Sequence, residues 1–187
     1  MTHLNRRGRP LSIKSFLCIC TLLTRLHLCQ GNCGYWVLSV ASKGWSLNPR
    51  PGLPIRIVLL VAMALFYLYA LLWCLARRGS VRVESASDVL RVFYYDFLRL
   101  RKEDVIIVKL TSRELVAVSV NPCPILKLSL ILRVDTRYSC RLVSETVCRR
   151  VLKCLNPSLA FTRDYNYIRP YSSGCRERIR LRSGPPR

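Results

Sequence analysis

Residues 57–76 read IVLLVAMALFYLYALLWCLA, and this stretch decides the fold class of the chain. Its twenty residues carry no charge, and a helix that rises 1.5 Å per residue needs about 20 residues to cross some 30 Å of hydrocarbon. A core helix of this length in a soluble protein normally has a polar stripe, which this stretch lacks. The pattern predicts a transmembrane helix within residues 55–78. The residues expected at its membrane boundaries are Arg56, Trp73, Arg77 and Arg78.

The charge of the chain is strongly positive and unevenly distributed. The 187 residues have a net charge of +21 and a pI near 10.3. Residues 1–83 hold eleven Lys and Arg and no acid, whereas residues 84–187 hold twenty Lys and Arg and ten acids. Such a balance attracts phosphate, and beside a membrane helix the simplest source is a bilayer with anionic headgroups. Nucleic acid is the weaker alternative partner.

The first 54 residues predict a leader and a short ectodomain. A basic start followed by FLCICTLL looks like a signal peptide within residues 1–31, although Arg25 and His27 interrupt its apolar part. A mitochondrial presequence and an uncleaved tail that lies on a membrane are the alternatives. Residues 32–54 would then form a loop-rich ectodomain that is too small to fold alone.

Charges beside the apolar helix predict its orientation. Residues 77–96 hold four arginines, whereas residues 36–55 hold one lysine and one arginine. Because cytosolic flanks are enriched in Lys and Arg, this bias predicts a cytosolic C-terminus. The expected location is the endoplasmic reticulum or another membrane of the secretory pathway, with the mitochondrial inner membrane as the alternative.

The ten cysteines do not form a recognisable framework. Most of them fall in the leader, in the apolar helix or in the part that we expect in the cytosol, where thiols stay reduced. The sequence has no Cys-x-x-Cys pair and no histidine after His27, so we predict no metal and no cofactor. Cys74 is a candidate for S-palmitoylation, and a thiol that packs between helices is the alternative.

Residues 80–156 predict a small α+β domain that begins with a basic amphipathic helix. Ser85 and Asp88 have the spacing of a capping box, and residues 88–102 follow with helical periodicity. The aromatic face of this helix can either enter a membrane surface or cover the sheet that follows, and the need of the sheet for a cover favours the second. The residues of the membrane-surface alternative are Arg91, Phe93, Phe97, Arg99, Arg101 and Lys102.

The rest of the domain predicts an antiparallel sheet. Residues 104–110 and 114–120 are rich in β-branched side chains and predict a hairpin. Alternating leucines predict a third strand at 125–134, and a short fourth strand is expected at 138–143. The fold class is therefore a single-pass α-helical anchor with an antiparallel sheet of three to four strands and one or two helices.

One further helix is expected at the end of the domain. Ser144 can cap the segment ETVCRRVLKCL at 145–155, whose apolar residues fall on one side. Asn156 and Pro157 then end this helix. The resulting core of about 75 residues is small for independent stability.

Residues 157–187 predict a flexible basic tail. They hold seven arginines and two acids and show no sustained periodicity. RERIRLR resembles arginine-based retention signals of the endoplasmic reticulum, and Tyr165 to Ile168 fits a tyrosine-based sorting pattern. Nucleic-acid binding and a purely solvated tail are the alternatives. The arginines of the retention pattern are Arg176, Arg178, Arg180 and Arg182.

Nothing in the sequence indicates an active site. Both histidines, His3 and His27, lie in the leader, and the chain has neither a glycine-rich phosphate loop nor a Gly-x-Ser-x-Gly elbow. We therefore expect a non-enzymatic, single-pass accessory protein, of a kind that viruses also encode, that recruits or organises a protein partner at a membrane surface. The alternatives are a small homo-oligomeric channel like a viroporin, a membrane-tethered nucleic-acid binder, and a reading frame not selected for a stable product.

Overall fold

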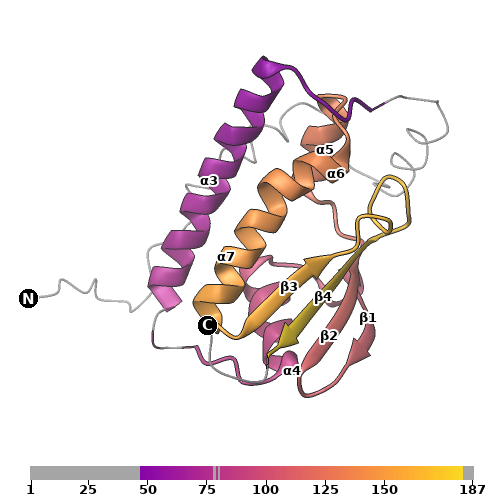
Figure 1. Cartoon of the computed structure of the whole chain (residues 1–187). Coiled ribbons are helices and arrows are strands. Elements are labelled where there is room, and N and C mark those ends of the chain that lie inside the picture. The colour runs from indigo at the N-terminus through magenta and orange to yellow at the C-terminus, as the bar shows by residue number, and fades with distance from the viewer. Residues whose placement is uncertain (1–46, 78, 80, 183–187) are drawn as a thin grey trace, which may run out of the picture. The chain divides into compact units, whose positions relative to one another are not determined.

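Figure 1 shows the computed structural model, in which residues 47–77, 79 and 81–182 are described and belong to one compact unit. The predicted leader at 1–31 and residues 32–46 of the predicted ectodomain lie outside the described residues. The helices are α3 (Leu53–Arg77), α4 (Ala86–Val89), η2 (Leu90–Phe97), η3 (Lys102–Asp104), α5 (Pro124–Ile131), α6 (Thr136–Ser139), η4 (Cys140–Glu145) and α7 (Thr146–Leu155). The strands are β1 (Val105–Leu110), β2 (Glu114–Ser119), β3 (Leu159–Arg163) and β4 (Cys175–Leu181).

The four strands form one antiparallel sheet in the order β1-β2-β4-β3. The predicted hairpin is confirmed, because β1 and β2 pair directly, with one irregularity in register between Ile107 and Lys109. β4 comes last in the chain but pairs with β2 and β3 on its two sides. The C-terminal strand therefore holds the middle of the sheet.

Two helical segments cover one face of this sheet. The predicted capping box is confirmed: the Ser85 hydroxyl accepts a hydrogen bond from the Asp88 backbone N–H, and the Asp88 carboxylate accepts one from the Ser85 backbone N–H. This helix runs through α4 and η2 to Phe97. The second segment is continuous from Thr136 through η4 to Leu155, and the Asp135 side chain caps its start.

Helix α3 forms a further layer. In Figure 1 it runs beside α7, and the sheet lies on the other side of α7. Among the described residues, α3 is the single helix that is long and apolar enough to cross a membrane. The same length and composition also fit a buried core helix, so this is weak evidence of a span.

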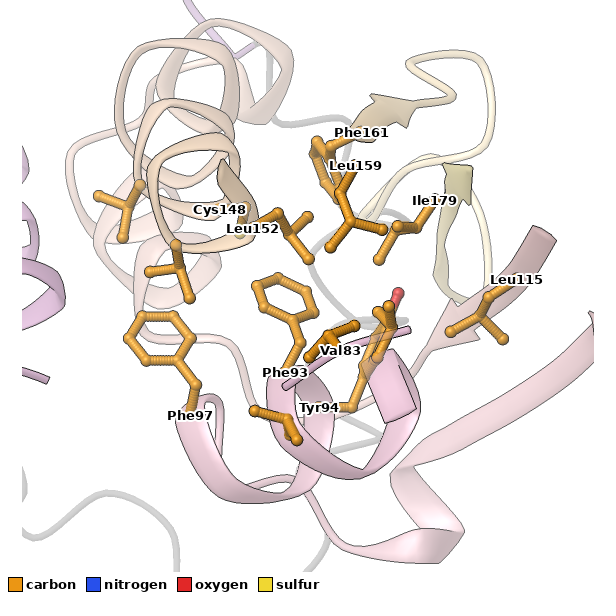
Figure 2. Close-up of a cluster of buried hydrophobic side chains, with 14 of the residues drawn as sticks. Val83, Phe93, Tyr94, Phe97, Leu115, Cys148, Leu152, Leu159, Phe161 and Ile179 are labelled. Atoms are coloured by element: carbon orange, nitrogen blue, oxygen red, sulfur yellow. The ribbon is translucent and has the colours of Figure 1, made fainter. Parts of the chain in front are cut away.

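The main core lies between the sheet and its helices. Figure 2 shows Phe93, Tyr94 and Phe97 from η2 facing α7 and the strands. Phe93 and Tyr94 are fully buried, and Phe93 stacks edge-on against Tyr94 and Phe161. A second, smaller cluster gathers around α5, α6 and η4 and includes Leu59 of α3.

Both strands expected between residues 125 and 143 are wrong, because these segments are helical. α5 occupies most of 125–134, with Pro124 at its first turn, where the missing N–H of proline costs nothing. The Ser129 hydroxyl donates to the Ile125 carbonyl, as a helix permits. Residues 138–143 lie in α6 and η4, so Ser144 is inside a continuous helix and caps nothing.

The predicted ends of two other segments are also corrected. The helix expected over 88–102 stops at Phe97, and Arg99 follows with a positive φ of 54°. The tail is not flexible over residues 159–163 and 175–181, which form β3 and β4. Residues 183–187 lie outside the described residues.

Candidate functional site: helix α3 and the basic sheet face

The inner face of α3 is part of the core along the length of the helix. Leu59 and Ala70 are fully buried, and Trp73 and Cys74 are almost so. Leu59 belongs to the smaller cluster, whereas Ala70, Trp73 and Cys74 belong to the larger one. When the half-buried Ile55, Met63 and Phe66 are counted with them, the inward-facing positions recur at intervals of three to four residues, which places them on one side of the helix.

The outer face of α3 is exposed and apolar. Between Ile57 and Ala76 the helix has no charged residue, so the described structure leaves a continuous hydrocarbon surface on the side away from the domain. Ile57 and Val61 are more than half exposed, and Leu75 is 63% exposed. Large exposed apolar patches mark sites that bind a membrane or another protein. The exposed large side chains of this outer face are Leu53, Ile57, Val58, Leu60, Val61, Leu65, Leu68, Leu72 and Leu75.

Contacts fasten α3 to the domain at both of its ends. Before the helix, the Asn48 N–H donates to the Arg133 carbonyl (2.9 Å), and the Asn48 carbonyl accepts from the Asp135 N–H (2.9 Å). Near its C-terminal end, Cys74 forms a disulfide with Cys154 of α7, with 6.3 Å between the Cα atoms. In the last turn, Arg77 Nη2 lies 2.9 Å from Asp96 Oδ1.

Aromatic rings add to the contact between α3 and η2. Phe97 stacks on Tyr69, with 5.6 Å between ring centroids, and meets Trp73 edge-on at 5.1 Å. Such pairs contribute about 0.5–1.5 kcal/mol beyond their buried area. Tyr69 and Trp73 therefore pack against the domain.

The predicted boundary residues fall at both ends of α3. Arg56 is exposed, and its Nε donates to the Pro51 carbonyl (2.9 Å). Arg77 sits in the last turn with its guanidinium 5.9 Å from the Trp73 ring centre. Trp73 faces the core instead of the outer surface, and the side chain of Arg78 lies outside the described residues.

The disulfide bears on the predicted palmitoylation of Cys74. We expected reduced thiols, and this expectation is wrong for Cys74 and Cys154. A cysteine in a disulfide has no thiol to acylate, so palmitoylation of Cys74 remains a prediction for the reduced protein only. Cys123, Cys140, Cys148 and Cys175 are free thiols.

The helix expected at the membrane surface covers the sheet, as favoured from the sequence. Phe93 and Phe97 are buried in the core and are not available for insertion into a bilayer. The basic residues of the same set are exposed, and Arg91 lies 3.6 Å from Asp88. The exposed basic residues of this set are Arg91, Arg99, Arg101 and Lys102.

The arginines of the predicted retention signal lie in a strand or at its end. Along β4, Glu177 and Ile179 face the core, and Arg176, Arg178 and Arg180 point to the opposite side of the sheet. Arg182 follows the strand and is exposed. We call Lys109, Glu114, Arg176, Arg178 and Arg180 the basic sheet face.

Glu114 is the acid of the basic sheet face and lies opposite Arg180. Its carboxylate lies 2.6 Å from Lys109 Nζ, 2.6 Å from Arg180 Nε and 3.3 Å from Arg178 Nε. Hydrogen bonds from Lys109 and Arg180 lower the pKa of Glu114 to about 2. Arg176 lies 3.9 Å from Asp164. The basic sheet face therefore has four cations and one carboxylate, a net charge of +3, and the neighbouring Asp164 reduces this to +2.

The residues of the sorting pattern are built into the fold. Ile168 is fully buried in the smaller cluster. The Tyr165 hydroxyl donates to a Glu145 carboxylate oxygen, and the Arg141 guanidinium lies 4.5 Å from the Tyr165 ring centre. A sorting receptor would need these side chains free, so the pattern stays a prediction for a chain in which this loop has opened.

Sequence reasoning missed a buried polar group between the sheet and η2. Arg163 of β3 donates from Nη2 to Glu177 Oε1 (2.5 Å), and the Tyr94 hydroxyl donates to Glu177 Oε2 (2.8 Å). Burial raises the pKa of Tyr94 well above its usual value, and the Glu177 carboxylate raises it further. The alternation of arginine with Glu177, Ile179 and Leu181 was the signal that could have revealed this strand.

A polar hollow of about 420 Å³ opens beside the edge strand β3. Its carboxylate, Glu145, is 2.5 Å from Arg149 and accepts from Tyr165. The other cations that line this hollow also have partners: Arg141 lies over the Tyr165 ring, and Arg163 pairs with Glu177.

No protein-family model matches the chain, and no curated protein or solved structure is significantly similar to it.

Proposed function

We propose that this protein is a non-enzymatic accessory protein that binds a membrane through α3 and recruits an acidic partner through its basic sheet face. The observation that carries the proposal is the outer face of α3, which is apolar throughout and exposed. A soluble domain normally covers such a surface with polar side chains or with another chain. A bilayer covers it without any further protein.

The layers of the domain support the second part of the proposal. α3 lies on one side of α7 and the sheet on the other, so the basic sheet face points away from the outer face of α3 (Figure 1). When α3 meets the bilayer, the arginine row of β4 is directed to the aqueous phase. There its charge attracts acidic partners, and this attraction weakens as the ionic strength rises.

Vesicle flotation with the full chain tests the membrane part. We expect the protein to float with vesicles that contain anionic lipid, and Leu68→Glu on the outer face to lower the bound fraction at least tenfold. The matched control is Ile107→Glu, which places the same charge at an equally exposed apolar position of β1, on the face opposite the basic sheet face. Equal binding of both variants and the parent, or no flotation of the parent, would refute the proposal.

Membrane-tethered nucleic-acid binding is the second candidate, and the regular arginine row on β4 favours it. Arg176, Arg178 and Arg180 share one face at intervals of about 6.6 Å along the strand. Cationic rows of this kind track a phosphate backbone, and their affinity falls steeply with salt. A titration with single-stranded RNA and DNA decides: no binding at about 0.15 M salt removes this candidate.

A further inference from the structure

We infer that α3 lies in the plane of the membrane surface, with its outer face in the lipid and its inner face still packed on the domain, instead of crossing the bilayer. This inference rests on the proposed membrane binding and adds the orientation of the helix. It replaces the single-pass topology that the sequence predicts. The occupant of the apolar face is an anionic bilayer.

The first support is packing along the whole helix. Buried side chains run from Leu59, near the start of α3, through Ala70 to Cys74, near its end. They contact both core clusters, so no part of the helix long enough to cross hydrocarbon is free of the domain. At 1.5 Å per residue the 25 residues of α3 span about 37 Å.

The second support is the fastening at both ends. Asn48 bonds to the Arg133 and Asp135 backbone before the helix, and the Cys74–Cys154 disulfide joins α3 to α7 near its other end. A transverse α3 with these contacts intact would draw α7 into the hydrocarbon. The exposed Arg149, Arg150 and Lys153 side chains of α7 oppose this, because charged groups are costly in the bilayer centre.

The alternative way to span the membrane is to detach α3 from the domain. Detachment would expose the partners of Leu59, Ala70 and Trp73 to water and would break the covalent link at Cys74. An in-plane helix needs neither change. Such helices bury one apolar face about 5–10 Å deep at the headgroup boundary, and here the domain occupies the other face.

Charge favours lipid over a second copy of the chain as the occupant. Arg50 precedes α3 and Arg56 lies in its first turn, Arg77 lies in its last turn and Arg82 follows it, and residues 1–83 contain no acid. Two copies that met along α3 would bring these like charges together, on molecules that each carry +21. Anionic headgroups complement both ends at once.

Protease protection of the full chain in microsomes tests the orientation. One epitope is inserted after Gly44, upstream of α3, and a second after Gly79, where the backbone has open space around it. We expect both epitopes to respond alike to protease, either both digested or both protected until detergent is added. One digested and one protected epitope would overturn the inference, because the helix would then cross the membrane.

A second measurement separates this inference from the proposed function. Non-reducing peptide mapping of the membrane-bound fraction should recover Cys74 linked to Cys154, which requires α3 to remain on α7. Membrane-bound protein with the epitopes on opposite sides, or with this link absent, refutes the in-plane helix alone. A chain that stays out of the membrane fraction, as a monomer or as a dimer, refutes the proposed membrane function as well.

Discussion

Arg163 and Glu177 form an ion pair inside the core, between the neighbouring strands β3 and β4. Arg163 Nη2 lies 2.5 Å from Glu177 Oε1, and both side chains are over 90% buried. Burial by itself would lower the pKa of the Arg163 guanidinium, but the Glu177 carboxylate raises it well above its usual range. The Tyr94 hydroxyl completes the group, so both carboxylate oxygens are hydrogen-bonded.

Removing the charge of Glu177 should strongly destabilise the fold. Glu177→Gln leaves the Arg163 guanidinium buried without a counter-charge, and breaking a buried pair on one side costs about 3–5 kcal/mol. Urea unfolding followed by circular dichroism measures the loss. The control is Glu103→Gln, an exposed carboxylate 3.9 Å from Arg101, which should change stability by less than about 0.5 kcal/mol. Equal stability of the two variants would contradict this role for Glu177.

Stability should fall as the pH rises above about 9. Burial raises the pKa of Cys140 and of Cys148 from 9.0 to about 12. The folded protein therefore keeps protons that the unfolded chain releases between these values, and stability is lost over that pH window at about 1.4 kcal/mol per unit for each thiol. Urea midpoints between pH 7 and 11 test this, and Cys148→Ala should flatten the slope. A midpoint that is constant to pH 11 would contradict it.

The sequence predicted the elements that carry strong local signals. The helix at 53–77 contains an uncharged apolar run over 57–76, the hairpin of β1 and β2 has β-branched runs on both sides of a short turn, and Ser85 and Asp88 have capping-box spacing. Each signal depends on residues close in the chain. These elements also supply the apolar face on which the proposed function rests.

The elements that were missed depend on contacts between distant residues. The alternating leucines at 125–134 resemble a strand, but leucine also favours helices, and Pro124 fits a first helical turn. β4 contains a glutamate, Glu177, at a core position. A charged residue does not predict a core position from sequence, and Glu177 can be buried only because Arg163 and Tyr94 pair with it. No glycine marks the helix ends before Arg99 and Arg133, which both adopt positive φ.

The basic sheet face also escaped prediction, because it forms only when β4 pairs with β2. The sequence showed its arginines as a linear signal at the end of the chain. Pairing places Arg180 opposite Glu114 and Arg178 opposite Val116. The arginines that the sequence presents as a linear signal therefore form one face of the sheet.

Loss of the disulfide should loosen α3 and should identify the compartment. Cys74 and Cys154 are 80 residues apart, and in the chain-entropy model a bond that closes such a loop contributes about 4 kcal/mol. Cys154→Ser should lower stability by that order, with Cys175→Ser, a free and half-buried thiol, as the control. Disulfides persist in oxidising compartments. We expect Cys154 to resist alkylation in intact cells, which would place the domain in the lumen or outside; alkylation of Cys154 would place it in the cytosol and contradict the bond.

Neutralising Glu114 should strengthen the binding of acidic partners to the basic sheet face. Its carboxylate pairs with Lys109, Arg178 and Arg180. Hydrogen bonds from Lys109 and Arg180 lower its pKa to about 2, so it is charged at neutral pH and competes with any incoming anion for these cations. Glu114→Gln raises the net charge of this face by one and releases three cations. We expect affinity for a short polyanion, such as heparin or single-stranded RNA, to rise several-fold at low salt, with a salt dependence steeper by about one unit.

Two variants make this last expectation specific to the sheet. Arg178→Glu should weaken polyanion binding, because it reverses a charge in the middle of the row. Glu103→Gln changes the net charge of the chain by the same amount as Glu114→Gln but lies before β1, away from the row, and should leave affinity within about twofold. If both glutamate variants raise affinity equally, the polyanion responds to net charge alone. The arginine row of β4 would then not be a recruiting surface, and the part of the proposed function that assigns an acidic partner to the basic sheet face would be wrong.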